Sequence, residues 1–102
     1  MKKSRYDIRA YCYDKRGRLI SEGRNNYDKT HPLQAHFAKI VGEEDKIYLH
    51  AEISALLRSR GKQVHKIHVE RIQNEATALA EPCPICMEAI KAFGVKVISY
   101  TL

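Results

Sequence analysis

The sequence predicts a single α/β domain in which helices and strands interleave around one sheet. The chain has 102 residues, which is the size of one small domain. Short segments with alternating apolar residues indicate strands, and segments with apolar residues at helical spacing lie between them. No repeat, low-complexity segment or linker divides residues 1–102. We therefore expect one domain with an α/β sandwich architecture.

The first two strands are predicted to form a hairpin. Residues 5–13 alternate so that one face carries Tyr6, Ile8, Ala10 and Cys12. Residues 14–17 have the composition of a turn, and residues 18–23 then form the second strand. Polar residues 24–29 are expected to be a loop.

Two helices are predicted next. Thr30 is the expected N-cap of the first helix, Pro32 suits its first turn and Gly42 ends it. Residues 43–46 form an acidic, exposed connection. The second helix is expected over residues 50–60, where apolar residues recur at helical spacing.

The rest of the chain predicts a strand, a helix and a strand. Residues 64–72 are strand-like, and residues 73–81 are expected to be a loop. Pro84 opens a third helix that stops at Gly94. Residues 95–100 form a last apolar strand.

Composition limits the classes of function. The apolar fraction is 44% and the charged fraction 29%, as in ordinary soluble proteins. No apolar run has the length of a membrane span, and the basic N-terminus leads into no signal core, so we expect a cytoplasmic protein without membrane contact. The net charge of +6 indicates either an anionic partner, such as phosphate or nucleic acid, or a basic solvated surface.

Three residues have the types and spacing of a zinc site. His50 begins a predicted helix, and the pair Cys83 and Cys86 begins another. Zinc prefers thiolate and imidazole ligands, and catalytic zinc sites use three protein ligands and leave the fourth position to water. Glu52, two residues after the histidine, is placed to act as an acid–base group beside the metal.

Two other interpretations remain open at this point. A Cys-x-x-Cys pair alone is also typical of a redox pair or a structural zinc knuckle. Cys12 is a possible fourth ligand, and a site closed in this way would activate no water. An odd number of cysteines, without a signal peptide, argues against a disulfide framework.

The motif His50-Ala51-Glu52 with Pro82-Cys83-Pro84-Ile85-Cys86 resembles the zinc signature of the cytidine and deoxycytidylate deaminases. The segments 22–25 and 81–83 are also similar to parts of bacterial tRNA adenosine deaminases. The resemblance implies a three-layer fold with a mixed sheet and with the zinc site on the helices. It implies substrate-binding roles for four residues, namely Asn25, Ala51, Glu81 and Pro82, of which Asn25 is expected to contact the sugar.

The resemblance also implies the reaction. Zinc lowers the pKa of water to about 7, the water attacks the ring carbon that bears the amino group, and Glu52 moves the protons. Relatives continue beyond the last predicted strand. This difference leaves a sheet edge to be covered, and we therefore expect a homo-oligomer.

The predicted function is zinc-dependent hydrolytic deamination of a cytosine nucleoside or nucleotide. One alternative is deamination of cytosine or adenine within single-stranded DNA or RNA, including tRNA, which the basic charge favours. A second alternative is a non-catalytic, zinc-stabilised module that binds nucleic acid.

Overall fold

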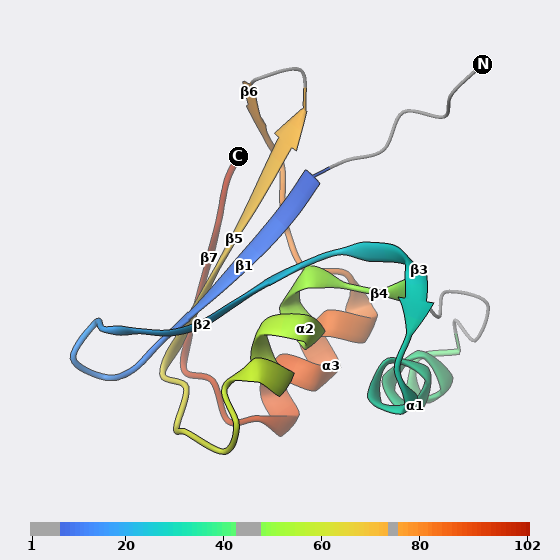
Figure 1. The fold of residues 1–102 in the computed structure, drawn as a ribbon, viewed down its shortest axis with the longest axis horizontal. Helices are drawn as coiled ribbons and strands as arrows, with labels where there is room; N and C mark the ends of the chain where they lie inside the picture. Colours follow the sequence, from blue (N-terminus) through green and yellow to red (C-terminus); the bar gives the residue numbers. More distant parts are fainter. Residues whose placement is uncertain (1–6, 43–47, 74–75) are drawn as a thin grey trace.

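The computed structural model describes residues 7–42, 48–73 and 76–102, which form three helices and seven strands (Figure 1). The strands are β1 Asp7–Tyr13, β2 Leu19–Arg24, β3 Asn26–Thr30, β4 Tyr48–Leu49, β5 Lys66–Gln73, β6 Ala76–Ala78 and β7 Val97–Tyr100. The helices are α1 Pro32–Ile40, α2 Ala51–Arg58 and α3 Pro84–Ala92. Within the described ranges, none of these helices is long and apolar enough to cross a lipid bilayer.

The main sheet is mixed and is built around β5. One edge of β5 pairs antiparallel with β1, which in turn pairs antiparallel with β2. The other edge of β5 is shared by two strands that lie end to end: β7 pairs with its first half in parallel, and β6 pairs with its last residues antiparallel. The predicted α/β class and mixed sheet are confirmed.

The core lies between one face of this sheet and the helices. Ala10 and Cys12 of β1 and Ile67 and Val69 of β5 point into it and are almost fully buried. α2 packs directly on β1 and β2, whereas α3 packs on α2 and α1.

The opposite face of the sheet differs from the three-layer expectation. Side chains on that face, such as Tyr11, Tyr13 and His68, are only half-buried. All three described helices lie on the same side of the sheet, because α1 packs against α3 instead of crossing to the other face (Figure 1). The described residues therefore form two layers of the three expected.

Two segments that were expected to be loops contain strands. Residues 26–30, which overlap most of the segment 24–29 that was expected to be a loop, form β3, and β3 pairs antiparallel with β4. Residues 76–78 form β6, which lengthens the sheet beside β5. Both predictions were wrong because these short strands are defined by their pairing partners and carry no apolar alternation.

The start of α1 also differs by one residue from the prediction. The N-cap is His31, whose Nδ1 accepts a hydrogen bond from the Leu33 N–H at 3.0 Å, and not Thr30. The acidic connection at residues 43–46 and the first two residues of the strand predicted at 5–13 lie outside the described residues.

A close approach between β2 and α2 fixes the helix on the sheet. A Cβ atom on Gly23 would lie closer than 3.0 Å to three atoms of α2, which belong to Ala51, Ser54 and Ala55. Next to it, the Ser21 hydroxyl donates a hydrogen bond of 2.8 Å to the carbonyl oxygen of Ala55. The missing side chain at Gly23 lets α2 lie directly on the sheet.

Candidate metal centre and pocket

The start of α2 is held in place from both sides of His50. His50 is the N-cap of the helix, and its carbonyl oxygen accepts a hydrogen bond from the Ser54 N–H at 3.0 Å. Its own N–H donates to Oε1 of Gln34 at 3.1 Å. Gln34 comes from α1 and is fully buried, so α1 positions the histidine through its backbone.

The start of α3 brings the two cysteines together. Cys83 is the N-cap, Pro84 occupies the first turn, and the Cys83 carbonyl oxygen accepts a hydrogen bond from the Met87 N–H at 2.9 Å. Cys86 is three residues further along, so its side chain lies on the same face of the helix start as that of Cys83.

The three predicted ligands converge on one point. Nδ1 of His50 lies 3.2 Å from Sγ of Cys86 and 3.5 Å from Sγ of Cys83, and all three donor atoms lie within 4.8 Å of one another. Zinc bonds of about 2.0 Å to nitrogen and about 2.3 Å to sulfur place tetrahedral ligands roughly 3.5 Å apart. The donor set and the spacing therefore fit a zinc ion with one position left for water.

The electrostatics of the cluster favour a bound cation. The hydrogen bond between the two cysteines lowers the pKa of Cys83, with a further contribution from the His50 ring, and raises the pKa of Cys86 well above its usual value, so the pair carries one thiolate. Both cysteines lie at the N-terminus of α3, whose exposed N–H groups also favour thiolates. A thiolate is the form that ligates zinc.

Glu52 lies beside the ligands without belonging to their group. Among the described residues, the metal-binding group contains only His50, Cys83 and Cys86. The Glu52 side chain is buried, and this burial raises the pKa of its carboxyl group because the charged form loses water.

Cys12 does not supply a fourth ligand. It is fully buried in the core, and the described metal-binding group does not include it. It lies four residues beyond Ile8 on β1, about 13 Å along the strand from the end that faces the pocket. The closed Cys3His site considered from the sequence is therefore wrong.

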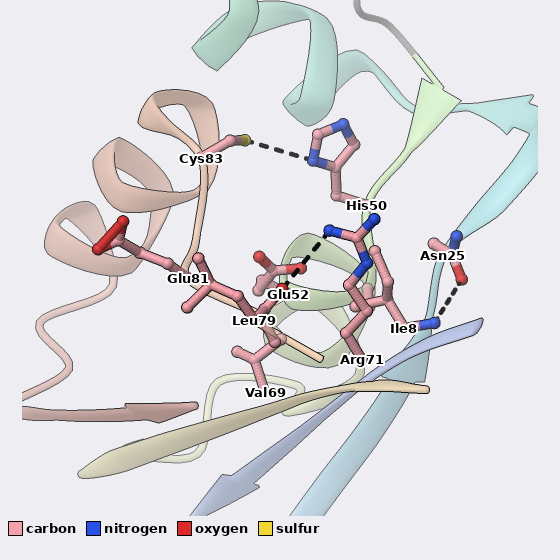
Figure 2. A pocket seen from close by; sticks show the side chains of 11 residues that line it. Ile8, Asn25, His50, Glu52, Val69, Arg71, Leu79, Glu81 and Cys83 are labelled. Carbon is pink, nitrogen blue, oxygen red and sulfur yellow. Dashed lines mark hydrogen bonds between the residues drawn. The ribbon is translucent and has the colours of Figure 1, made fainter. Parts of the chain in front are cut away.

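A pocket of about 150 Å³ opens beside the ligands (Figure 2). Its floor is formed by the ends of β1 and β5, and its walls by the start of α2 and by the segment that leads into α3. The lining residues are Ile8, Asn25, His50, Ala51, Glu52, Val69, Arg71, Leu79, Ala80, Glu81 and Cys83.

Three of the four expected substrate-binding residues line this pocket. Asn25 lies at its edge, where its Oδ1 accepts a hydrogen bond from the Ile8 N–H at 3.1 Å. Ala51 and Glu81 also line it, but the Glu81 carboxylate points away and accepts a hydrogen bond from the Tyr100 hydroxyl at 3.3 Å (Figure 2). Pro82 is buried and does not line the pocket.

Arg71 is a pocket residue that the sequence analysis missed. Its guanidinium group extends over the pocket near Glu52, and its Nη1 donates to the Leu79 carbonyl oxygen at 3.5 Å (Figure 2). The sequence does contain a signal for it, because Arg71 continues the buried face of Ile67 and Val69 at a spacing of two. A cation at the end of a buried strand face indicates a polar cavity.

Comparison with known proteins agrees with this geometry. No curated protein matches the chain. The family model described as the cytidine and deoxycytidylate deaminase zinc-binding region matches residues 1–102. The match spans the strands, both helix starts and all three ligands, and zinc is the cofactor that this family binds. The chain therefore belongs to the family of the cytidine and deoxycytidylate deaminase zinc-binding region.

Proposed function

We propose that the protein is a hydrolytic deaminase that removes the exocyclic amino group of a cytosine nucleoside or nucleotide and releases ammonia. The observation that carries this proposal is the small pocket in which the buried Glu52 lies beside the three zinc ligands. A structural zinc site needs neither an adjoining pocket nor a buried carboxyl group.

The size of the pocket supports cytosine over a purine. A cavity of about 150 Å³ is large enough to accept one benzene-sized ring. A pyrimidine has one such ring, whereas adenine and guanine have two fused rings. The sugar of a bound nucleoside would then lie at the mouth of the pocket, where Asn25 is located.

Glu52 is the proton-transfer group of the proposed reaction. When bound, zinc lowers the pKa of water to about 7 and so provides a nucleophile at neutral pH. Glu52 accepts a proton from that water and delivers it to the ring nitrogen next to the reacting carbon. Glu52 then carries the second proton of the water oxygen to the amino nitrogen. The bond from the ring carbon to this nitrogen breaks, ammonia leaves, and the oxygen stays on the ring as a carbonyl.

Other residues that line the pocket support binding of the base. The Arg71 guanidinium carries only hydrogen-bond donors, so it suits the ring carbonyl oxygen of cytosine. Ile8 and Val69 supply an apolar floor for the ring face and help to exclude water from it.

A substrate panel tests the proposal. Zinc-loaded protein is incubated with nucleosides, nucleotides and free bases of cytosine, adenine and guanine, and with single-stranded DNA and RNA, and ammonia release is measured. We expect release from cytosine substrates. Release from adenine or guanine alone would overturn the choice of base, and binding of nucleic acid without any release would favour the non-catalytic zinc module.

The basic charge favours one second candidate. The chain has a net charge of +6, which suits cytosine or adenine held within single-stranded DNA or RNA. The polynucleotide arm of the panel decides this point.

The compartment that we infer is the cytoplasm, since all three cysteines are free and thiolate ligands persist under reducing conditions.

We also infer that the protein works as a homo-oligomer. The outer edge of β7 has no strand partner among the described residues, and Val97 on that strand is 42% exposed. An unpaired edge with apolar side chains favours association with another copy.

A further inference from the structure

A second hollow adjoins the zinc pocket. Asn25 lines both hollows, and Leu49 of the second is followed directly in the chain by His50 of the first. The second hollow is larger, about 350 Å³ against about 150 Å³. A base that fills the zinc pocket would have the rest of its nucleotide next to this hollow.

Three cations line this hollow, which we call the cationic groove. They are Arg24, Lys29 and Arg58, and Glu22 is the one carboxylate among the lining residues that the structure describes. Among the described residues, Lys29 and Arg58 form no ion pair, and Arg24 has only a long one, 3.9 Å to Asp7. The groove therefore has an excess of positive charge available to an anion.

The cations come from three elements that the fold brings together. Arg24 ends β2, Lys29 belongs to β3 and Arg58 ends α2. Arg58 lies eight residues after His50, which corresponds to about 12 Å along the helix. The groove thus extends from the edge of the zinc pocket over roughly the length of one nucleotide.

We propose that the cationic groove binds a phosphate group of the substrate. The base occupies the zinc pocket, the sugar passes Asn25, and the phosphate contacts Arg24, Lys29 and Arg58. This inference rests on the proposed function and narrows its substrate class to phosphate-bearing cytosine compounds. The phosphate belongs either to a free nucleotide or to a polynucleotide backbone, which present the same group.

A binding experiment tests the groove separately from catalysis. The wild-type zinc protein is titrated with uridine, with uridine 5′-monophosphate and with a short single-stranded DNA, none of which needs to react. The double variant Lys29→Glu with Arg58→Glu is compared with Lys96→Glu, which reverses an exposed charge outside the groove. Zinc content and circular dichroism verify that each variant is folded.

We expect the wild type to bind one phosphate-bearing probe at least about tenfold more tightly than uridine, since contacts between cations and phosphate are charge-assisted. The double variant should lose this preference, while Lys96→Glu retains it. If the DNA is the preferred probe, the slope of the logarithm of the binding constant against the logarithm of the salt concentration should also be smaller by about two in the double variant.

If the double variant loses a preference for uridine 5′-monophosphate over uridine, the phosphate belongs to a free nucleotide. If it loses a preference for the DNA over uridine, the phosphate belongs to a polynucleotide backbone. The proposal is overturned if the wild type shows no preference for either phosphate-bearing probe, or if the double variant changes affinity no more than Lys96→Glu does. Absence of ammonia release in the panel would count against the deaminase reaction alone, because the binding ratios do not depend on turnover.

Discussion

At the scale of single residues, the zinc site depends on side chains from two helix starts. We predict one zinc per chain, and Cys83→Ser and Cys86→Ser should each lose most of it, because a hydroxyl is a poor zinc ligand. Metal analysis of the purified proteins measures this. Cys12→Ser is the matched control and should retain its zinc. Full zinc content in both ligand variants would show that these two cysteines do not bind the metal.

Cys12 should be chemically inert in the folded protein. Burial raises the pKa of its thiol to about 11, so about one Cys12 in a thousand is a thiolate at pH 8. Alkylation by iodoacetamide at pH 8, followed by mass spectrometry, should leave Cys12 unmodified until denaturant is added. The rate of Cys12 alkylation should rise with pH up to about 11, because deprotonation of the thiol produces the nucleophilic thiolate. Rapid native labelling at pH 8 would contradict the buried position.

The residues of the site differ in how far the sequence could predict them. The ligands and Glu52 form a motif whose spacing reflects two helix starts, so their chemistry is readable from the chain. Arg71 and Leu79 form pocket walls only because β5 and the segment before α3 meet beside α2. Gln34 contacts His50 from another helix. Apart from the position of Arg71 on the inward face of its strand, such contacts are set by tertiary packing and leave little trace in local patterns.

At the scale of elements, the close approach between β2 and α2 at Gly23 holds the start of α2 at the pocket. Gly23→Ala would place a Cβ against backbone atoms of α2, and we predict a loss of stability of about 3 kcal/mol together with weaker zinc binding. Chemical denaturation and zinc competition measure the two effects. The crowding is with backbone, which has little freedom to move aside.

Gly17→Ala is the matched control for Gly23→Ala. Gly17 has φ of +81° but nothing within 4 Å of an added Cβ, so the substitution should cost about 1 kcal/mol through backbone strain alone. Its zinc affinity should equal that of the wild type. Equal losses of zinc affinity in both variants would show that the close approach of β2 and α2 does not position the site.

The elements themselves were predictable where their periodicity was strong. The hairpin of β1 and β2, the three helices and β5 carry apolar residues at strand or helix spacing. β3 and β4 are polar or very short, and they are strands because distant segments pair, as Asn26 does with Leu49. The position of α1 on α3 likewise depends on packing between elements and not on the pattern of α1 itself.

At the scale of the whole molecule, the exposed edge of β7 leads to a prediction of association. Sedimentation at micromolar protein should show a homo-oligomer, and Val97→Lys should shift it toward the monomer, because a charge on an edge strand opposes pairing. Leu102→Lys, at an exposed residue outside the strand, is the control. A monomeric wild type with full activity would contradict the prediction.

The central claim is that Glu52 transfers protons in a zinc-dependent deamination. The most direct test is the rate of ammonia release from the best cytosine substrate, measured for the wild type and for Glu52→Gln at equal zinc content. Glutamine keeps the size of the side chain but cannot exchange protons in this way. We expect a rate at least about 100-fold lower in the variant, with its zinc retained. Equal rates at equal zinc content would contradict it.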